Sequence, residues 1–210
     1  MAGERLEFPK GFVWGTSTAG HQIEGHNSHS DWWRFEHEGK IKDGTVSGKC
    51  MDYWNRYEED HDLMTTLGYK AFRLGIEWAK IEPDDGRIDR AAIERYKKIL
   101  QSLRDHNLQI CLTLYHWVLP LWFADKGGWL WEDAVARFMK FTEIAVNEFA
   151  EFPDLWVTLN EPLVPAAAGY LAGEFPPEKK SIKFYGKVTG KLLRAHALNY
   201  ELIHKTVKKG

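Results

Sequence analysis

The chain has 210 residues, of which 44% are hydrophobic and 28% are charged, and its formal net charge is -2 at pH 7. These values are typical of a soluble globular protein and exclude an intrinsically disordered chain. Lys and Arg are scattered rather than clustered, so nothing favours a nucleic acid or an acidic membrane as a partner.

The cysteines and histidines predict no cofactor and no metal site. Cys50 and Cys111 lie far apart, outside metal-ligand spacing, so neither a disulfide framework nor a zinc site is predicted. His21, His26 and His29 share a loop, but their spacing is no known chelating pattern.

The N-terminus has no apolar signal core, and no apolar run approaches the ~20 residues of a membrane span. We therefore expect a cytoplasmic protein that binds no membrane.

Short runs of strand formers alternate along the chain with longer segments of helical period, which is typical of parallel βαβ units. Strands are predicted over 12–15, 71–76, 109–115 and 155–159, and helices over 52–68, 89–107, 131–152 and 186–210. Asp89 is a plausible N-cap of the second helix, and Gly68 ends the first. No low-complexity segment or linker interrupts this pattern, so we predict a single domain over residues 1–210.

Repeated βα units lead to a doubly wound sheet or to a barrel. The glycine-rich turn of a dinucleotide fold does not follow the first strand, which favours the barrel. Polar and aromatic residues also gather at or after the carboxyl ends of all four strands, where a barrel has its active face: Gln22, Arg73, His116, Trp117, Asn160 and Glu161. A closed (β/α)8 TIM barrel has eight strands and typically ~250 residues. The predicted fold class is therefore α/β, with the chain covering the first four βα units, a half barrel.

Four ordered motifs stand out: FPKGFVWGTSTAGHQIEG, FRLGIEWAKIEP, LTLYHWVLPLWF and WVTLNEP. Together they resemble the N-terminal half of glycoside hydrolase family 1, the family of β-glucosidases and β-galactosidases. The likeness runs over nearly the whole chain and stops where the family's fifth strand would begin. It implies a retaining β-glycosidase that hydrolyses terminal non-reducing β-D-glycosides, with a small β-glycoside or an oligosaccharide as substrate.

The resemblance implies three catalytic positions. Glu161 resembles the general acid/base, Asn160 the residue that hydrogen-bonds the sugar's 2-hydroxyl, and Arg73 the arginine beside the nucleophilic carboxylate. The chemistry of Glu161 agrees, because a glutamate near Trp and Pro at the end of an apolar strand should be desolvated, which favours its protonated form. Retention also needs a second carboxylate ~5–5.5 Å away as nucleophile.

Three further positions match residues that bind hydroxyls of the non-reducing sugar: Gln22, His116 and Trp117. Glutamine and histidine can each donate and accept hydrogen bonds, and the indole ring offers an apolar platform for a pyranose. Taken singly, these residues also fit structural roles. An arginine on a strand is more often half of an ion pair, a lone histidine is more often a satisfied interior residue, and Gln22 is more often simply exposed.

The family's nucleophile lies in an Ile/Val-Thr-Glu-Asn-Gly motif, and no segment of this chain matches it. The other carboxylates near strand ends lack that context: Glu24, Asp62 and Glu77. Glu77 stands where serine is common in the family, although glutamate also appears in some relatives, and it is expected to support the site without contacting the substrate. Gly20 and His21 stand where Ala-Tyr is frequent, a change expected to alter local packing or sugar preference.

Four strands leave two open sheet edges, which a soluble protein must cover. A complementary C-terminal half barrel would cover these edges and supply the missing nucleophile. The chain is expected to hydrolyse glycosides only when that half is present. The alternative is a non-catalytic half barrel that binds sugar or associates with itself.

Overall fold

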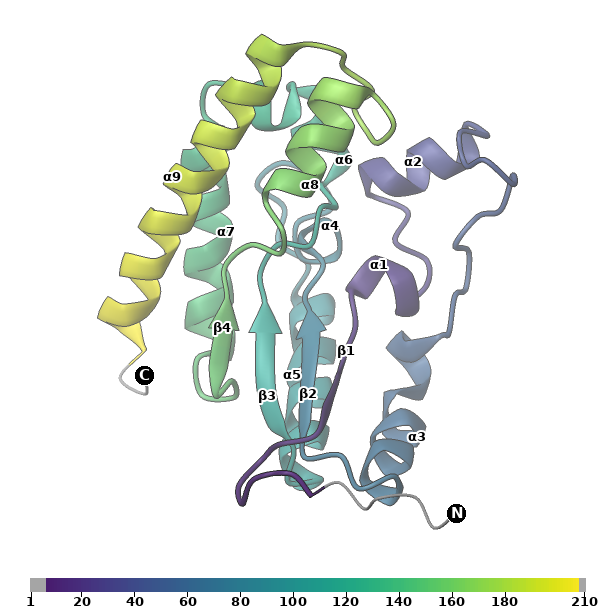
Figure 1. Ribbon diagram of the computed structural model, residues 1–210, viewed down its shortest axis with the longest axis vertical. Helices are drawn as coiled ribbons and strands as arrows, with labels where there is room; N and C mark the ends of the chain where they lie inside the picture. Colours follow the sequence, from purple (N-terminus) through teal and green to yellow (C-terminus); the bar gives the residue numbers. More distant parts are fainter. Residues whose placement is uncertain (1–6, 208–210) are drawn as a thin grey trace.

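The computed structural model describes residues 7–207, and a parallel four-stranded sheet of order β1-β2-β3-β4 runs through it (Figure 1). The strands are β1 (Gly15–Ser17), β2 (Ala71–Gly75), β3 (Gln109–Thr113) and β4 (Leu155–Val157). Because spatial order equals sequence order and every pair is parallel, each connection crosses over the sheet, as in a βα-barrel. The predicted α/β class and its half-barrel extent are confirmed.

Long helices lie beside and behind the strands (Figure 1). They are α3 (Tyr53–Thr66), α5 (Arg90–Asp105), α7 (Ala134–Phe149) and α9 (Ile182–Thr206). Shorter segments form the connections: α1 (Gly20–Ile23), α2 (Asp31–His37), α4 (Trp78–Ile81), α6 (Leu121–Asp125), η1 (Gly128–Leu130), α8 (Leu163–Ala167) and η2 (Ala168–Ala172). Within residues 7–207, no helix is long and apolar enough to cross a membrane.

The hydrophobic core lies between the sheet and the long helices. The apolar face of α5 is fully buried, as Ile93 and Leu100 illustrate. Trp78 stacks on Phe141 of α7 with ring centroids 5.1 Å apart. Trp129 is also buried, so this indole ring serves core packing rather than ligand binding. This packing gives the strand ends a rigid support.

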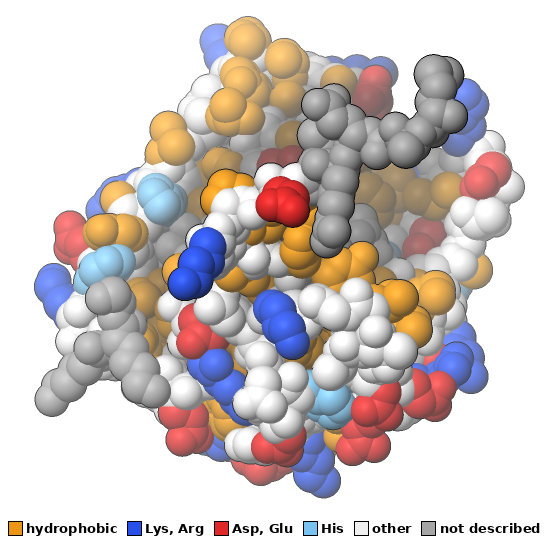
Figure 2. Space-filling model, turned by 60° about the horizontal axis from the view of Figure 1, so that its bottom comes forward, with side chains coloured by type: hydrophobic (Ala, Val, Ile, Leu, Met, Phe, Trp, Pro, Cys, Tyr) orange, Lys and Arg blue, Asp and Glu red, His pale blue; other side chains and the backbone are white. Residues whose placement is uncertain are grey.

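The strand predicted over 12–15 is wrong in its position, because β1 begins only at Gly15. The apolar residues before it form an aromatic cluster instead: the ring of Phe8 lies 4.7 Å from that of Phe12 and 4.6 Å from that of Trp14. All three side chains are about half exposed, and hydrophobic side chains gather at this lower end of the molecule (Figure 2). At Gly15, a Cβ atom would lie 2.7 Å from the carbonyl oxygen of Ala71 in β2, so a side chain does not fit at this position.

The helix predicted over 186–210 begins earlier, at Ile182. The Ser181 side chain caps it by accepting a hydrogen bond from the backbone N–H of Phe184 at 3.4 Å. The predicted range therefore missed the first turn over 182–185, and the predicted residues 208–210 lie outside the described part of the chain.

Asp89→Ala is expected to lower the free energy of unfolding by about 1 kcal/mol, because it removes an N-cap. The Asp89 carboxylate accepts hydrogen bonds from the backbone N–H groups of Ala91 (2.8 Å) and Ala92 (3.1 Å). Urea denaturation measures the loss. Asp133→Ala is the matched control, since Asp133 occupies the N-cap position of α7 without a side-chain capping bond. Equal losses in the two variants would contradict the capping role.

Candidate active site

The carboxyl ends of the four strands meet at the upper edge of the sheet in Figure 1, below α1, α4 and α8. The predicted site residues belong to this edge: Arg73 lies in β2, and the segments that hold His116 and Asn160 follow β3 and β4. The parallel strands bring these positions together, although Arg73 and His116 lie 87 and 44 residues from Asn160 in sequence.

Asn160 is the centre of the hydrogen-bond network at this edge. Its Oδ1 accepts a hydrogen bond from Arg73 Nη2 at 2.6 Å. Its Nδ2 lies 3.1 Å from His116 Nε2 and donates to Glu161 Oε2 at 3.2 Å. The backbone N–H of Asn160 donates to the carbonyl of Tyr115 at 2.8 Å, and the residue is only 8% exposed. One rigidly held amide therefore links the three predicted polar side chains.

The network also fixes the protonation of His116. A guanidinium cannot accept a hydrogen bond, so the amide oxygen of Asn160 must face Arg73 and its NH2 group must face His116. Nε2 of His116 is then an acceptor, and the ring proton lies on Nδ1. Burial, together with the charge of Arg73, lowers the pKa of His116, which favours this neutral form. Nδ1 has no hydrogen-bond partner within residues 7–207.

Arg73 is half-buried and has no carboxylate partner among the described residues. Besides Asn160, its guanidinium contacts Thr113, to whose Oγ1 it donates through Nε at 3.0 Å. No ion pair of Arg73 occurs within residues 7–207, so the alternative of a structural ion pair inside this part of the chain is not realised. A fixed positive charge remains available at the edge of the sheet, where it can hold an anionic group.

Glu161 and Trp117 both adopt left-handed backbone conformations, with φ of 44° and 72°. Non-glycine residues in this region carry strain of about 1–3 kcal/mol, a feature that clusters at functional sites. The indole N–H of Trp117 donates to the carbonyl of Asn160 at 3.1 Å. Glu161 itself is exposed, so the described residues do not provide the desolvated setting expected for it from the sequence.

Gln22 lies on the short helix α1 and is exposed. No hydrogen bond joins its side chain to another residue of the described range 7–207. The structure thus gathers five of the six predicted positions around Asn160 and leaves Gln22 outside that network.

Two aromatic residues that sequence reasoning missed extend the apolar surface of Trp117. The ring of Phe175 lies 5.9 Å from that of Trp117 and 4.9 Å from that of Trp32. Both side chains are partly exposed. The aromatic-rich segment DWWRF was a signal for Trp32, whereas nothing in the local sequence marked Phe175.

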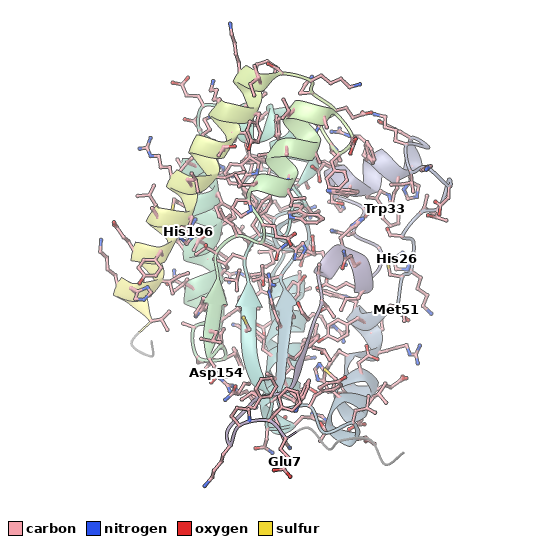
Figure 3. The ribbon with its side chains drawn as sticks, in the orientation of Figure 1. Glu7, His26, Trp33, Met51, Asp154 and His196 are labelled. Atoms are coloured by element: carbon pink, nitrogen blue, oxygen red, sulfur yellow. The ribbon has the colours of Figure 1, made fainter. Side chains whose placement is uncertain are left out.

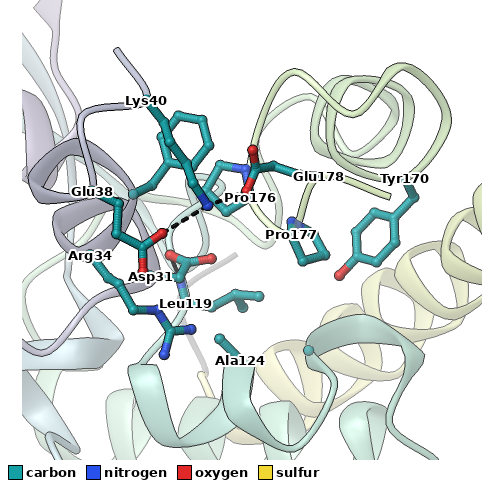
Figure 4. A pocket seen from close by; sticks show the side chains of 12 residues that line it. Asp31, Arg34, Glu38, Lys40, Leu119, Ala124, Tyr170, Pro176, Pro177 and Glu178 are labelled. Carbon is teal, nitrogen blue, oxygen red and sulfur yellow. Dashed lines mark hydrogen bonds and ion pairs between the residues drawn. The ribbon is translucent and has the colours of Figure 1, made fainter. Parts of the chain in front are cut away.

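A separate cavity of about 270 Å³ lies between α2 and the segment after η2 (Figure 4). Asp31 lines it, and burial raises the pKa of Asp31 to about 7 although two backbone N–H groups donate to its carboxyl group. Lys40 bridges Glu38 and Glu178 across one side of it. None of the six predicted site residues lines this cavity.

The loop histidines are not arranged as a metal site. His21 Nδ1 lies 3.4 Å from Asn27 Nδ2, whereas His26 and His29 are exposed. No group of three or more His, Cys, Asp or Glu side chains within residues 7–207 could hold a metal ion.

Comparison with known proteins shows that the chain matches a protein family. The family model for glycosyl hydrolase family 1 matches residues 4–210. A 1,4-beta-D-glucan glucohydrolase of Thermotoga neapolitana is 35% identical over 97% of this chain and 50% of its own length. The chain spans about half the length of the curated relatives that it matches.

Solved structures agree in fold and extent. A beta-glycosidase from Pyrococcus horikoshii superposes with a TM-score of 0.90 at 39% identity, covering 96% of this chain and 47% of that one. A beta-glucosidase from Thermotoga maritima in complex with glucoimidazole gives a TM-score of 0.93 at 35% identity, covering 97% and 48%. The family model, the relatives and the arrangement of strands and polar residues all lead to one conclusion: the chain belongs to glycosyl hydrolase family 1.

Proposed function

We propose that this chain is the acid/base half of a retaining β-glycosidase that hydrolyses terminal non-reducing β-D-glycosides in the manner of a β-glucosidase. The observation that carries the proposal is the convergence of Arg73, His116 and Glu161 on Asn160. Family membership and the beta-glucosidase relatives support the same activity.

The two chemical steps divide between Glu161 and a second carboxylate. Glu161, protonated, donates its proton to the glycosidic oxygen while the second carboxylate attacks the anomeric carbon, so that the aglycone leaves as an alcohol. Glu161, now ionised, takes a proton from water, whose oxygen displaces the enzyme carboxylate from the sugar. The second carboxylate is proposed to come from the part of the relatives that this chain does not span. The uncompensated charge of Arg73 supports its placement nearby.

The remaining residues are proposed to bind the sugar. Asn160, His116 and Gln22 would hold hydroxyl groups, and Trp117 would face the apolar side of the ring. The unpartnered Nδ1–H of His116 supports a binding role, because buried polar groups normally have a partner. A solved beta-glucosidase from Thermotoga maritima binds glucoimidazole, which supports a glucose-like ring as the substrate group bound here.

The open side of the sheet supports a complementary half barrel as partner. An apolar groove of about 240 Å³ lies between β4 and α9, and Leu155 and Tyr200 beside it are 64% and 53% exposed. The indole N–H of Trp156 in β4 is buried without a partner among residues 7–207. Exposed apolar surface beside an unpaired strand edge favours association. The free thiols of Cys50 and Cys111 support a reducing compartment such as the cytoplasm.

Mixing tests the proposal directly. This chain, refolded with a fragment that carries the remaining four βα units of a family relative, is expected to release aryl alcohol from an aryl β-glucoside, whereas neither piece does so alone. Absence of turnover from a mixture that forms a stable one-to-one complex would overturn it. A stable homodimer that binds glucose without hydrolysis would instead support the non-catalytic alternative.

A further inference from the structure

The short helix α1, which carries Gln22, is held by a buried carboxylate from the segment after β2. Glu77 is only 4% exposed. Its Oε1 accepts a hydrogen bond from the backbone N–H of His21 at 2.9 Å, and its Oε2 accepts one from Asn27 Nδ2 at 2.8 Å. One side chain thus joins the start of α1 to the loop that follows it.

Gly20 and Glu77 fit each other as a pair. A Cβ on Gly20 would lie 2.5 Å from both Cγ and Oε1 of Glu77, a distance that real side chains do not show. The observed position of the Glu77 side chain against α1 therefore requires that residue 20 has no side chain, and a larger residue there would force Glu77 to shift.

The other end of α1 is fixed by the same region of the fold. The hydroxyl of Tyr96 in α5 donates to the Glu24 carboxylate, with its oxygen 2.9 and 3.0 Å from the two carboxylate oxygens, and accepts from the backbone N–H of Glu77 at 2.8 Å. Lys80 Nζ donates to the carbonyl of Gly25 at 2.8 Å and lies 3.9 Å from Glu24 Oε2. Both ends of α1 are therefore held by hydrogen bonds to the segment after β2, to α4 and to α5.

We infer that Glu77 is a positioning residue for the sugar site, because it fixes the backbone on which Gln22 stands at the carboxyl edge of the sheet. This inference rests on the proposed function for the role of Gln22. A four-residue helix has no stability of its own. Since no described residue holds the Gln22 side chain, its place depends on the backbone contacts of α1.

Substitutions at position 77 separate hydrogen bonding from charge and bulk. In Glu77→Gln, the amide oxygen can still accept from the His21 N–H. Its NH2 group can donate to Asn27 Oδ1, which has no partner within residues 7–207, once the Asn27 amide turns over. Glu77→Ala removes both contacts. The glutamine variant should therefore behave as the wild type, whereas the alanine variant should release α1.

Hydrogen exchange in the intact chain tests the contact itself. In Glu77→Ala, exchange of the His21 amide is expected to speed up by about tenfold or more, as for the loss of one buried hydrogen bond. Exchange in Glu77→Gln is expected to stay close to wild type. The amide of Leu114, which donates to Val157 across β3 and β4, serves as an internal control. An unchanged His21 exchange rate in Glu77→Ala would overturn the inference.

Kinetics in the assembled enzyme tests the consequence for sugar binding. Glu77→Ala is expected to raise KM for an aryl β-glucoside by about tenfold with kcat nearly unchanged. Glu77→Gln is expected to keep KM close to the wild-type value. Gln22→Ala is the reference and should raise KM similarly. If Gln22→Ala raises KM and Glu77→Ala does not, the positioning role is wrong while the proposed function stands. If neither the Gln22 nor the Glu161 variant changes the kinetics, the proposed function fails instead, and the exchange rates still decide whether Glu77 holds α1.

Discussion

Glu161→Gln in the assembled enzyme is expected to lower kcat/KM about 10²- to 10⁴-fold toward glycosides with poor leaving groups, the usual contribution of a positioned general acid. The amide keeps the size of the side chain but has no acidic proton for the glycosidic oxygen. Its amide oxygen can still accept a hydrogen bond from Asn160 Nδ2, which lies 3.2 Å from Oε2 of the native carboxylate. The binding geometry should therefore survive while proton transfer is lost.

The leaving group separates acid catalysis from a structural defect. An aryl glycoside whose phenolate departs without protonation should lose far less in its first step than an alkyl glycoside. Glu174→Gln, at an exposed glutamate after η2, is the matched control and should change neither rate. Steady-state kinetics across a series of phenols and alcohols measures the difference. Equal losses for all leaving groups would contradict the role of Glu161 as proton donor.

The free energy of unfolding is expected to fall as the pH rises from about 5 to 8, because three buried carboxyl groups stay protonated in the folded state after they have ionised in the unfolded chain. Burial raises the pKa of Glu24 to about 8 and those of Glu77 and Asp31 to about 7. The folded protein then binds more protons than the unfolded chain above pH ~4, so their stabilising effect is complete below that pH and is lost as the pH passes 7 to 8. Each group contributes a slope of about 1.4 kcal/mol per pH unit while only its folded form is protonated.

A buried histidine acts in the opposite sense at lower pH. Burial lowers the pKa of His61 to about 4, so stability rises with pH from about 4 to 6.5 and this contribution is complete above that range. Three carboxyl groups outweigh one histidine, so the net slope is negative from about pH 5 and levels off near pH 8. Urea midpoints at several pH values measure the decline.

Glu24→Gln tests the assignment, since the glutamine oxygen can still accept from the Tyr96 hydroxyl but cannot ionise. It is expected to flatten the decline by the contribution of one group. Glu151→Gln, at an exposed position beyond α7, is the control that should leave the slope unchanged. A slope that stays the same in Glu24→Gln would show that other groups cause the pH dependence.

Much of the fold was already present in local sequence patterns. The periodic stripe of α5 and its cap at Asp89 predicted a helix that begins within one residue of the observed start at Arg90. The alternation of such helices with short apolar strands predicted four βα units. The short helices were not predicted, because segments of four to seven residues are too short to show a helical period in the sequence. The strand near residue 12 was misplaced because aromatic rings that pack on one another look like strand residues in sequence.

The sequence by itself determined the order of the strands, the polar residues at their ends and the motif that ends in Asn160 and Glu161. Periodicity, caps and motifs are local properties, and they can be read within a window of about 20 residues. Only the tertiary structure decided that Asn160 joins Arg73 across 87 residues, that its amide also meets His116, and that Glu161 is exposed within residues 7–207. These features depend on which side chains packing brings within hydrogen-bond distance, and no local pattern records that.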